Sequence, residues 1–134
     1  MTAAPRPESA KILIVDDQPS VRHFVGRVLK NAGYTTVSAS DGPEALKIIE
    51  ASGAVNLLVT DLIMPQMRGD ELARRVRRAD PAVKVLYVTA HRDQLFQETA
   101  TLGDAETFLD KPFAMHDLLE AVLNRTGIPG ERIV

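Results

Sequence analysis

Several residue types are scarce or missing in this chain, and each absence narrows what the protein can be. The 134 residues include no cysteine and no tryptophan, and aromatic residues make up only 4%. Without cysteine there is no disulfide, thiolate nucleophile or zinc–thiolate site, which fits a reducing cytoplasm. No apolar run approaches the roughly 20 residues of a membrane-spanning helix, and the first ten residues lack the apolar segment of a signal peptide. We therefore expect a cytoplasmic protein that makes no membrane contact.

Neither sign of charge is in excess. Sixteen lysines and arginines stand against 18 aspartates and glutamates, for a net charge of −2. This balance gives no electrostatic reason to expect a nucleic-acid partner. The arginines of segment 73–78 surround the apolar Val76, as expected for the solvated face of a helix. The length corresponds to one domain, which can bury roughly two-thirds of its unfolded surface.

Short apolar runs alternate along the chain with longer segments of helical period. The predicted strands are residues 12–15, 35–39, 57–60, 85–89 and 107–109. The predicted helices are residues 21–29, 43–51, 69–79, 93–102 and 114–125. Strict alternation of strand and helix predicts a parallel sheet with helices on both faces, and the near-continuous apolar character of most strands agrees. The fold class is therefore α/β, a doubly wound five-stranded parallel sheet with five helices.

The domain boundaries follow from composition. Residues 1–10 are rich in proline and alanine and are expected to form a flexible lead-in. The α/β pattern fills residues 11–126, and residues 127–134 are expected to form a short tail. No internal repeat or linker to a second domain interrupts the pattern.

Polar side chains stand where the predicted strands end. Asp16 and Asp17 follow the first strand and Asp61 follows the third, while Thr89 ends the fourth and Lys111 follows the fifth. In open parallel sheets, ligands bind at the carboxyl ends of strands, near the point where the strand order reverses. If the first and third strands are neighbours, these five side chains converge on one edge of the sheet.

Three clustered carboxylates repel one another, so either their pKa values rise or a cation lies among them. Two like charges about 4 Å apart cost on the order of 4 kcal/mol at an effective dielectric constant near 20. Carboxylate oxygens suit Mg²⁺, or the similar Mn²⁺, which takes its remaining ligands from water and phosphate oxygens. A carboxylate beside such a metal and a lysine can attack phosphorus and form an acyl phosphate. The bland alternative for Asp16 and Asp17, capping of the first helix, leaves Asp61 and Lys111 unexplained.

Four segments carry a resemblance to a known family: "ILIVDDQPSVR", "LLVTDLIMPQMRGDEL", "VLYVTA" and "FLDKPF". Together, in this order and at strand ends, they resemble the receiver domain of bacterial two-component response regulators, from residue 11 to about residue 125. The resemblance implies a flavodoxin-like sheet of order 2-1-3-4-5. It also implies a stand-alone, single-domain regulator with a place in phosphorelay signal transduction.

The same resemblance implies a role for each acidic residue. Asp61 would be the phosphoacceptor, taking its phosphoryl group from a histidine kinase or a histidine phosphotransfer protein. Asp17, Asp61 and the backbone carbonyl of Ile63 would bind Mg²⁺ directly, and Asp16 would help through water. Beyond its own phosphorylation and dephosphorylation, the chain would catalyse no reaction.

Further residues would shape the phosphorylated state. Thr89 would hydrogen-bond the phosphoryl oxygens, and Lys111 would form an ion pair with them. A cis Lys111–Pro112 bond would direct the ammonium group into the pocket. Thr89 and Phe108 would form the switch, with Phe108 in a position where the family often has tyrosine. Ile63 and His91 occupy the two variable positions that tune the lifetime of the phosphoryl group.

Two surfaces are predicted for protein partners. Val21 and Phe24 lie on the rim of the first helix, where a kinase or phosphotransfer helix must approach, so part of that rim should be exposed. The downstream target should dock on the fourth helix, fifth strand and fifth helix, including Phe96, Thr107 and Phe108. The protein is expected to be a monomer or a weak dimer.

Three other interpretations remain open at this point. An aspartyl-phosphate phosphohydrolase on a similar fold would need a general acid two residues after the nucleophile, where this chain has Ile63. A flavin carrier of the same topology would need a phosphate-binding loop after the first strand, where this chain has two carboxylates. A receiver excised from a hybrid histidine kinase would carry the same motifs as a stand-alone receiver.

Overall fold

The structure is a computed structural model that describes residues 10–90 and 106–127. The strands are β1 (Lys11–Val15), β2 (Thr35–Ala39), β3 (Leu57–Thr60), β4 (Lys84–Thr89) and β5 (Glu106–Asp110). The helices are α1 (Pro19–Asn31), α2 (Gly42–Ser52), α3 (Gly69–Ala79) and α5 (Met115–Thr126). The helix predicted at residues 93–102, together with His91 and Phe96, lies outside the described residues. No helix in the described part of the chain is long and apolar enough to span a membrane.

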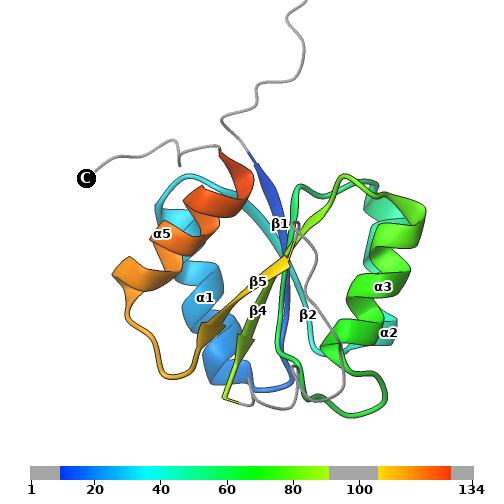
Figure 1. The fold of residues 1–134 in the computed structure, drawn as a ribbon, viewed down its shortest axis with the longest axis horizontal. Helices are drawn as coiled ribbons and strands as arrows, with labels where there is room; N and C mark the ends of the chain where they lie inside the picture. Colours follow the sequence, from blue (N-terminus) through cyan, green and yellow to red (C-terminus); the bar gives the residue numbers. More distant parts are fainter. Residues whose placement is uncertain (1–9, 91–105, 128–134) are drawn as a thin grey trace, which may run out of the picture.

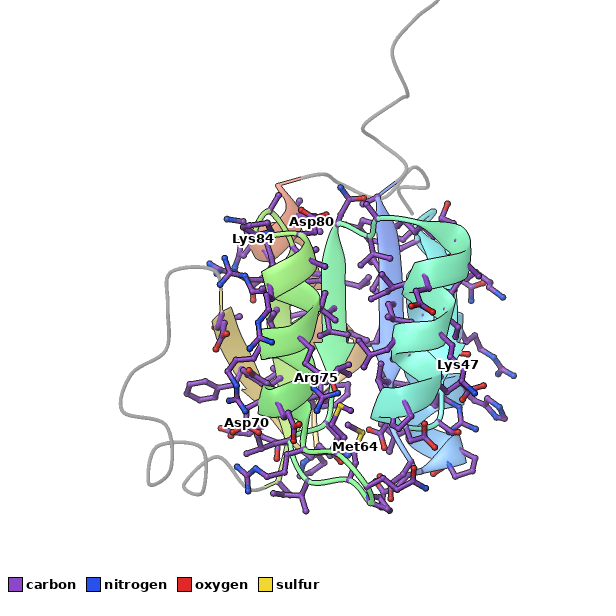
Figure 2. All side chains as sticks on the ribbon, turned by 90° about the vertical axis from the view of Figure 1, so that its right-hand side faces the viewer. Lys47, Met64, Asp70, Arg75, Asp80 and Lys84 are labelled. Atoms are coloured by element: carbon purple, nitrogen blue, oxygen red, sulfur yellow. The ribbon has the colours of Figure 1, made fainter. Side chains whose placement is uncertain are left out.

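All five strands run parallel in the order β2-β1-β3-β4-β5, which confirms the predicted fold class. Helices α1 and α5 cover one face of the sheet, and α2 and α3 cover the other (Figure 1). Figure 2 looks onto the face that α2 and α3 cover. The strand order reverses between β1 and β3, where Val15 pairs with Thr60. Asp16 and Asp61 each follow one of these paired residues, so the topology alone brings the two carboxylates to one edge.

The alternation of side chains along the central strands builds a core on each face of the sheet. Leu13 and Val15 pack toward α2 and α3, whereas Ile12 and Ile14 pack toward α1 and α5. Strands β1, β3 and β4 are buried on both faces, which explains their near-continuous apolar sequence. The core therefore fixes the carboxyl ends of these three strands in place.

The edge strands depart from that pattern. β2 has the sequence TTVSA and β5 the sequence ETFLD, and both are only partly buried. An edge strand has one neighbour and tolerates polar residues, so β5 extends one residue beyond the apolar prediction at each end. Helix α1 also begins earlier than its first apolar residue, at Pro19, because proline suits the first turn of a helix.

The loop between β3 and α3 requires glycine at its end. The backbone N–H of Gly69 donates to the carbonyl oxygen of Leu62 over 2.7 Å. A Cβ atom at this position would overlap the backbone carbonyl of Asp61. By contrast, a Cβ at Gly26 in α1 would meet no atom closer than Ile14 Cδ1 at 3.9 Å. The start of α3 is therefore packed directly against the backbone of Asp61.

Substituting these two glycines should have opposite effects on stability. Gly69→Ala should lower the free energy of unfolding by about 1–3 kcal/mol, because the added methyl group displaces the backbone around Asp61. Gly26→Ala should raise it by roughly 0.5–1 kcal/mol, because alanine fits there and loses less entropy in a helix. Denaturant unfolding of both variants measures the difference. Equal stability of the two would contradict the tight packing at Gly69.

Candidate acidic phosphoryl and metal site

The three predicted carboxylates meet at the carboxyl edge of the sheet. One oxygen each from Asp16, Asp17 and Asp61 lies within 4.8 Å of the other two. Asp16 and Asp61 are buried, with 2% and 7% of their surface exposed, whereas Asp17 is exposed. The cluster therefore consists of two buried carboxylates and one that is exposed to solvent.

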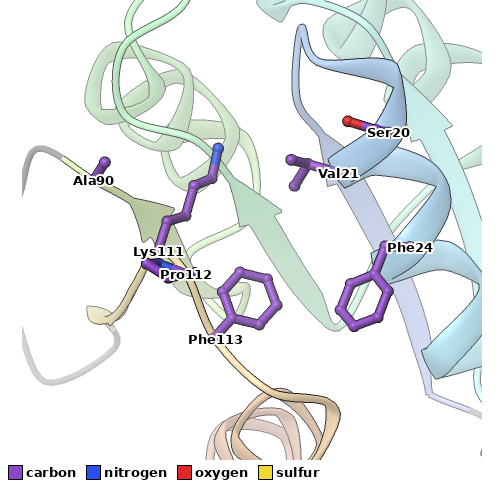
Figure 3. A pocket seen from close by; sticks show the side chains of 7 residues that line it. All are labelled: Ser20, Val21, Phe24, Ala90, Lys111, Pro112 and Phe113. Atoms are coloured by element: carbon purple, nitrogen blue, oxygen red, sulfur yellow. The ribbon is translucent and has the colours of Figure 1, made fainter.

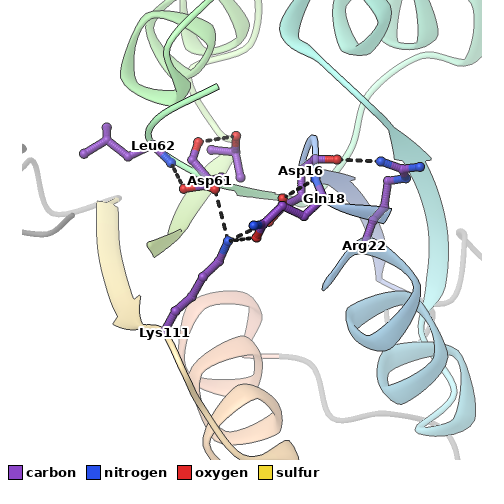
Figure 4. Close-up of polar contacts among 7 residues, drawn as sticks. Asp16, Gln18, Arg22, Asp61, Leu62 and Lys111 are labelled. Carbon is purple, nitrogen blue, oxygen red and sulfur yellow. Dashed lines mark hydrogen bonds and ion pairs between the residues drawn. The ribbon is translucent and has the colours of Figure 1, made fainter. Parts of the chain in front are cut away.

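Lys111 forms ion pairs with both of the buried carboxylates. Its Nζ atom lies 3.0 Å from Asp61 Oδ2 and 3.1 Å from Asp16 Oδ2 (Figure 4). The lysine comes from the turn after β5, and its backbone N–H donates to the carbonyl of Thr89 over 2.9 Å. The Lys111–Pro112 peptide bond is cis, as the resemblance implied.

Two further polar residues hold Asp16 and were not among the predicted site residues. The Gln18 N–H donates to Asp16 Oδ1 over 2.9 Å, and Gln18 Oε1 accepts from Lys111 Nζ at 3.2 Å. Arg22 Nη1 donates to the backbone carbonyl of Asp16 over 2.6 Å (Figure 4). A glutamine directly after two aspartates was the only sequence signal for Gln18, and Arg22 had no signal beyond its position in the first turn of α1.

Asp61 is held by its own loop as well as by Lys111. The backbone N–H of Leu62 donates to Asp61 Oδ1 over 2.7 Å. The hydroxyl of Thr60 donates to the backbone carbonyl of Asp61 over 2.9 Å. Both carboxylate oxygens thus have a donor, so the side chain has a defined orientation at the edge of the sheet.

The burial of these groups changes their proton affinities. Burial raises the pKa of the Asp16 carboxyl, and the nearby charge of Asp61 adds to this. The Gln18 backbone hydrogen bond and Lys111 oppose the rise without cancelling it. Burial alone would lower the pKa of Lys111, but its hydrogen bond and charge interactions with Asp61 and Asp16 outweigh burial and raise it. The lysine is therefore firmly protonated, and ionisation of Asp16 is costly.

The residues present fit a small divalent cation. The ligands of Mg²⁺ lie about 2.1 Å from the metal, so two opposite ligands are about 4.2 Å apart. The three carboxylate oxygens lie within 4.8 Å of one another, so a small inward movement of the side chains brings them to that spacing. Beside these oxygens lies a cavity of about 300 Å³, which is lined by Asp17, Gln18, Asp61, Ile63, Ala90 and Lys111. The donors are all oxygens, the ligand type that Mg²⁺ and Mn²⁺ prefer.

Of the remaining predicted site residues that the structure describes, Ile63 lines the cavity, whereas Thr89 and Phe108 do not. The side chain of Thr89 is fully buried at the end of β4, and the next residue, Ala90, lines the cavity instead. Phe108 is half-buried and packs against the core on the α2 and α3 side of the sheet. Ile63 is half-buried at the cavity wall. His91 lies outside the described residues.

An apolar pocket adjoins the charged one. Its volume is about 420 Å³, and Val21, Phe24, Lys111, Pro112 and Phe113 contribute to its lining. The rings of Phe24 and Phe113 lie opposite each other with centroids 6.0 Å apart (Figure 3). Phe24 is 42% exposed, so the expected exposure on the rim of α1 is present. The sequence had indicated Val21 and Phe24 but not the opposing Phe113.

Comparison with known proteins agrees with this fold and identifies a family. The family described as "Response regulator receiver domain" matches residues 12–123. The response regulator MprA of Mycobacterium ulcerans (strain Agy99) is 41% identical over 124 residues, covering 90% of this chain and 53% of MprA. The sensor kinase CckA of Brucella abortus (strain 2308) is 36% identical over 115 residues, covering 85% of this chain and 12% of the kinase.

A solved structure shows the same similarity in three dimensions. The chemotaxis response regulator CheY4 of Vibrio cholerae superposes with a TM-score of 0.76 at 32% identity, covering 87% of this chain and 98% of that one. The chain belongs to the response regulator receiver domain family, the phosphorylation-controlled signalling domain of two-component systems. It spans about half the length of MprA and a small part of CckA.

Neutralising Asp16 should stabilise the metal-free protein. The raised pKa means that the folded state binds the Asp16 proton more tightly than the unfolded state does. Stability from this group is therefore greatest at low pH and falls as pH rises through the raised pKa. Asp16→Asn should raise the free energy of unfolding at neutral pH, because the folded state then no longer holds a buried charge at this position.

The control for this experiment is Asp17→Asn, because Asp17 is exposed. The increase in the free energy of unfolding caused by Asp16→Asn should shrink below about pH 4, where carboxyl groups are protonated in the unfolded chain. Thermal unfolding across pH without divalent cations measures both effects. A loss of stability in Asp16→Asn at neutral pH would contradict the assignment of a costly buried charge.

Proposed function

We propose that Asp61 accepts a phosphoryl group from a histidine kinase or a histidine phosphotransfer protein, and that phosphorylation changes which protein the chain contacts. The observation that carries this proposal is the position of Asp61, whose carboxylate lies at the edge of the sheet, 3.0 Å from the Lys111 ammonium. One oxygen each from Asp16 and Asp17 lies within 4.8 Å of an Asp61 oxygen, and Asp17 lines the same cavity as Asp61. Membership in the receiver family supplies the class of donor.

The chemistry is a transfer of one phosphoryl group between two side chains. An Asp61 carboxylate oxygen attacks phosphorus, a P–O bond forms, and the P–N bond to the donor imidazole breaks. The nitrogen of the donor keeps the electron pair and takes up a proton. Lys111 stabilises the negative charge of the incoming phosphoryl oxygens, since its ammonium already lies at the carboxylate.

The metal would be held by groups that the fold already brings together. We propose Asp17, Asp61 and the Ile63 carbonyl as direct ligands of Mg²⁺, with Asp16 acting through water. Bound there, the metal would neutralise carboxylate and phosphoryl charge. Gln18 and Lys111 keep the carboxylate of Asp16 oriented toward the site.

We propose no catalytic activity beyond the formation and hydrolysis of the acyl phosphate on Asp61. A phosphohydrolase of related chemistry needs a proton donor at position 63, and isoleucine has none. MprA and CckA carry the matching segment within longer chains. The step at Asp61 is the same for a stand-alone receiver and for a receiver domain of a larger regulator or hybrid kinase.

Phosphorylation should occur at Asp61 and require a divalent cation. With Mg²⁺ and acetyl phosphate, the full chain should gain one base-labile, acid-stable phosphoryl group, measured by intact mass. Asp61→Asn should abolish the gain, because an amide oxygen is not a competent nucleophile here. Asp117→Asn, on the exposed surface of α5, is the control and should be phosphorylated normally. Persistent phosphorylation of Asp61→Asn would overturn the assignment.

We propose that the phosphodonor protein docks on the apolar pocket beside Asp61. The rim is formed by Phe24 and Val21 of α1, and Phe113 lies on the opposite side. Lys111 borders both this pocket and the acidic cavity, so a helix seated here would bring its histidine to Asp61. Exposed aromatic side chains are frequent sources of binding energy in protein interfaces.

Removing the exposed ring should slow transfer from a protein donor and leave chemical phosphorylation intact. Phe24→Ala should lower the rate from a phosphorylated histidine phosphotransfer protein about tenfold, since an aromatic anchor commonly contributes more than 1 kcal/mol. Its rate with acetyl phosphate should stay unchanged. Leu123→Ala is the matched control, because Leu123 is also 42% exposed but lies on α5. Equal effects of the two substitutions would contradict docking at α1.

We propose that Thr89 and Phe108 convert phosphorylation into a change of surface. Thr89 is buried at the end of β4, next to the cavity, and Phe108 is half-buried on the neighbouring β5. Inward movement of Thr89 toward a phosphoryl oxygen would free space beside β5 for the Phe108 ring, coupling a hydrogen bond to a packing choice. The output surface would then include Thr107, Phe108 and α5, together with the predicted fourth helix.

Thr89→Ala should separate phosphorylation from this response. Asp61 should still be phosphorylated, but the amide shift changes at residues 106–110 should fall, because alanine cannot donate the hydrogen bond. Nuclear magnetic resonance spectra of the phosphorylated wild type and variant give the comparison. Thr35→Ala is the control, because Thr35 is exposed on β2, the edge strand on the far side of the sheet from β5. An undiminished response in Thr89→Ala would show that the coupling does not run through this hydroxyl.

A further inference from the structure

A second polar groove lies between α1 and the edge strand β2, away from the acidic cavity. Its volume is about 370 Å³. Its charged and hydroxyl-bearing lining residues are Arg22, His23, Arg27, Lys30, Thr36 and Ser38. Phe24, on the proposed docking rim, is two residues from Gly26 at the groove, or about 200° around the helix. The floor of the groove and the docking rim therefore lie on different faces of α1, with Arg27, three residues after Phe24, between them.

The charge of this groove is one-sided. Two arginines and a lysine line it, and no carboxylate does so among the residues that the structure describes. The groove between α2 and α3 is different, because its arginines share the lining with Glu50 and Glu71. There Arg75 pairs with Glu71 at 2.7 Å. Around the groove between α1 and β2, Glu44 interacts electrostatically with Arg22, but no carboxylate lines the part of the groove formed by Arg27 and Lys30 in the described structure.

Contacts that stabilise the fold explain only some of the positively charged residues in this groove. Arg22 donates to the Asp16 carbonyl, and Lys30 lies in the last turn, where a cation complements the helix dipole. Neither explanation applies to Arg27. It follows His23 by four residues and precedes Lys30 by three, so these side chains gather on one face and repel one another when charged. An anion bound in the groove would attract each of these positive groups and so offset their mutual repulsion.

The shape of the groove suits a compact ligand with an apolar part. Gly26, Ile14 and Val37 line it between the charged groups. Gly26 contributes no side chain, and a Cβ atom built there would lie 3.9 Å from Ile14 Cδ1. From Arg22 to Lys30 the helix rises about 12 Å, and the groove volume lies within the roughly 300–1,000 Å³ of small-ligand sites.

We propose that this groove binds a nucleotide-sized molecule that carries two phosphate groups. The phosphates lie against Arg27 and Lys30, which present charge-assisted hydrogen-bond donors. The ring system covers the apolar floor at Gly26 and Val37. The hydroxyls of Thr36 and Ser38 on the edge strand supply further hydrogen bonds. This site is independent of Asp61 and requires no divalent cation.

The test is calorimetric titration of the full chain with ADP, adenosine and pyrophosphate, without divalent cations, at about 0.15 M salt. The acidic cavity repels phosphate under these conditions, so binding there does not interfere. ADP should bind one-to-one and at least roughly tenfold more tightly than adenosine, because charged hydrogen bonds dominate. Amide shifts should change at residues 22–31 and 36–38. No ADP binding, or shifts centred on residues 16–18 and 61–63, would overturn the proposal.

Two variants and a matched control locate the site. The double variant Arg27→Gln, Lys30→Gln should weaken ADP binding at least tenfold. The double variant Arg74→Gln, Arg78→Gln removes the same charge from the exposed face of α3 and should bind ADP as the wild type does. Gly26→Leu should block binding by filling the floor, with thermal unfolding to verify the fold. Equal loss in both double variants, or binding only to long polyanions such as DNA, would show a general charge effect and contradict a nucleotide site.

Discussion

The contact of one ammonium group with two buried carboxylates is the constraint on which the site depends. Lys111 reaches from the end of β5 to Asp16 after β1 and Asp61 after β3. Without a cation between them, these carboxylates would repel each other in a region of low dielectric constant. Removing the lysine would leave two buried carboxylates uncompensated, which costs several kcal/mol. The lysine therefore permits the protein to fold with its acidic residues already at the edge of the sheet.

The same arrangement leaves the charge of the site incompletely balanced. One lysine faces three carboxylates, and the pKa of Asp16 remains raised despite the ammonium at 3.1 Å. A divalent cation would remove the excess negative charge, and a phosphoryl group would then find both a metal and an ammonium. The charge distribution that weakens the apo protein is thus the one that prepares it for phosphoryl transfer.

The sequence predicted most of this because strand ends carry direct signals. Apolar runs ending in Asp16, Asp61 and Lys111 gave both the strands and the residues beyond them. Strand limits were less well predicted where a strand lies at the edge, as in β5, because partial burial permits Glu106 and Asp110. Contacts between remote side chains had no local signal. Phe113 meets Phe24 from another element, and Gln18 joins Lys111 across 93 positions of sequence.

The most direct test of the account is a Mg²⁺ titration followed by nuclear magnetic resonance, comparing wild type with Asp17→Asn. The wild type should bind one ion, with saturable amide shifts at residues 16–18 and 61–63. Asp17→Asn should bind at least about tenfold more weakly, because a charged oxygen ligand is lost. Shifts elsewhere in the chain, or unchanged affinity in Asp17→Asn, would contradict a metal site formed by the clustered carboxylates.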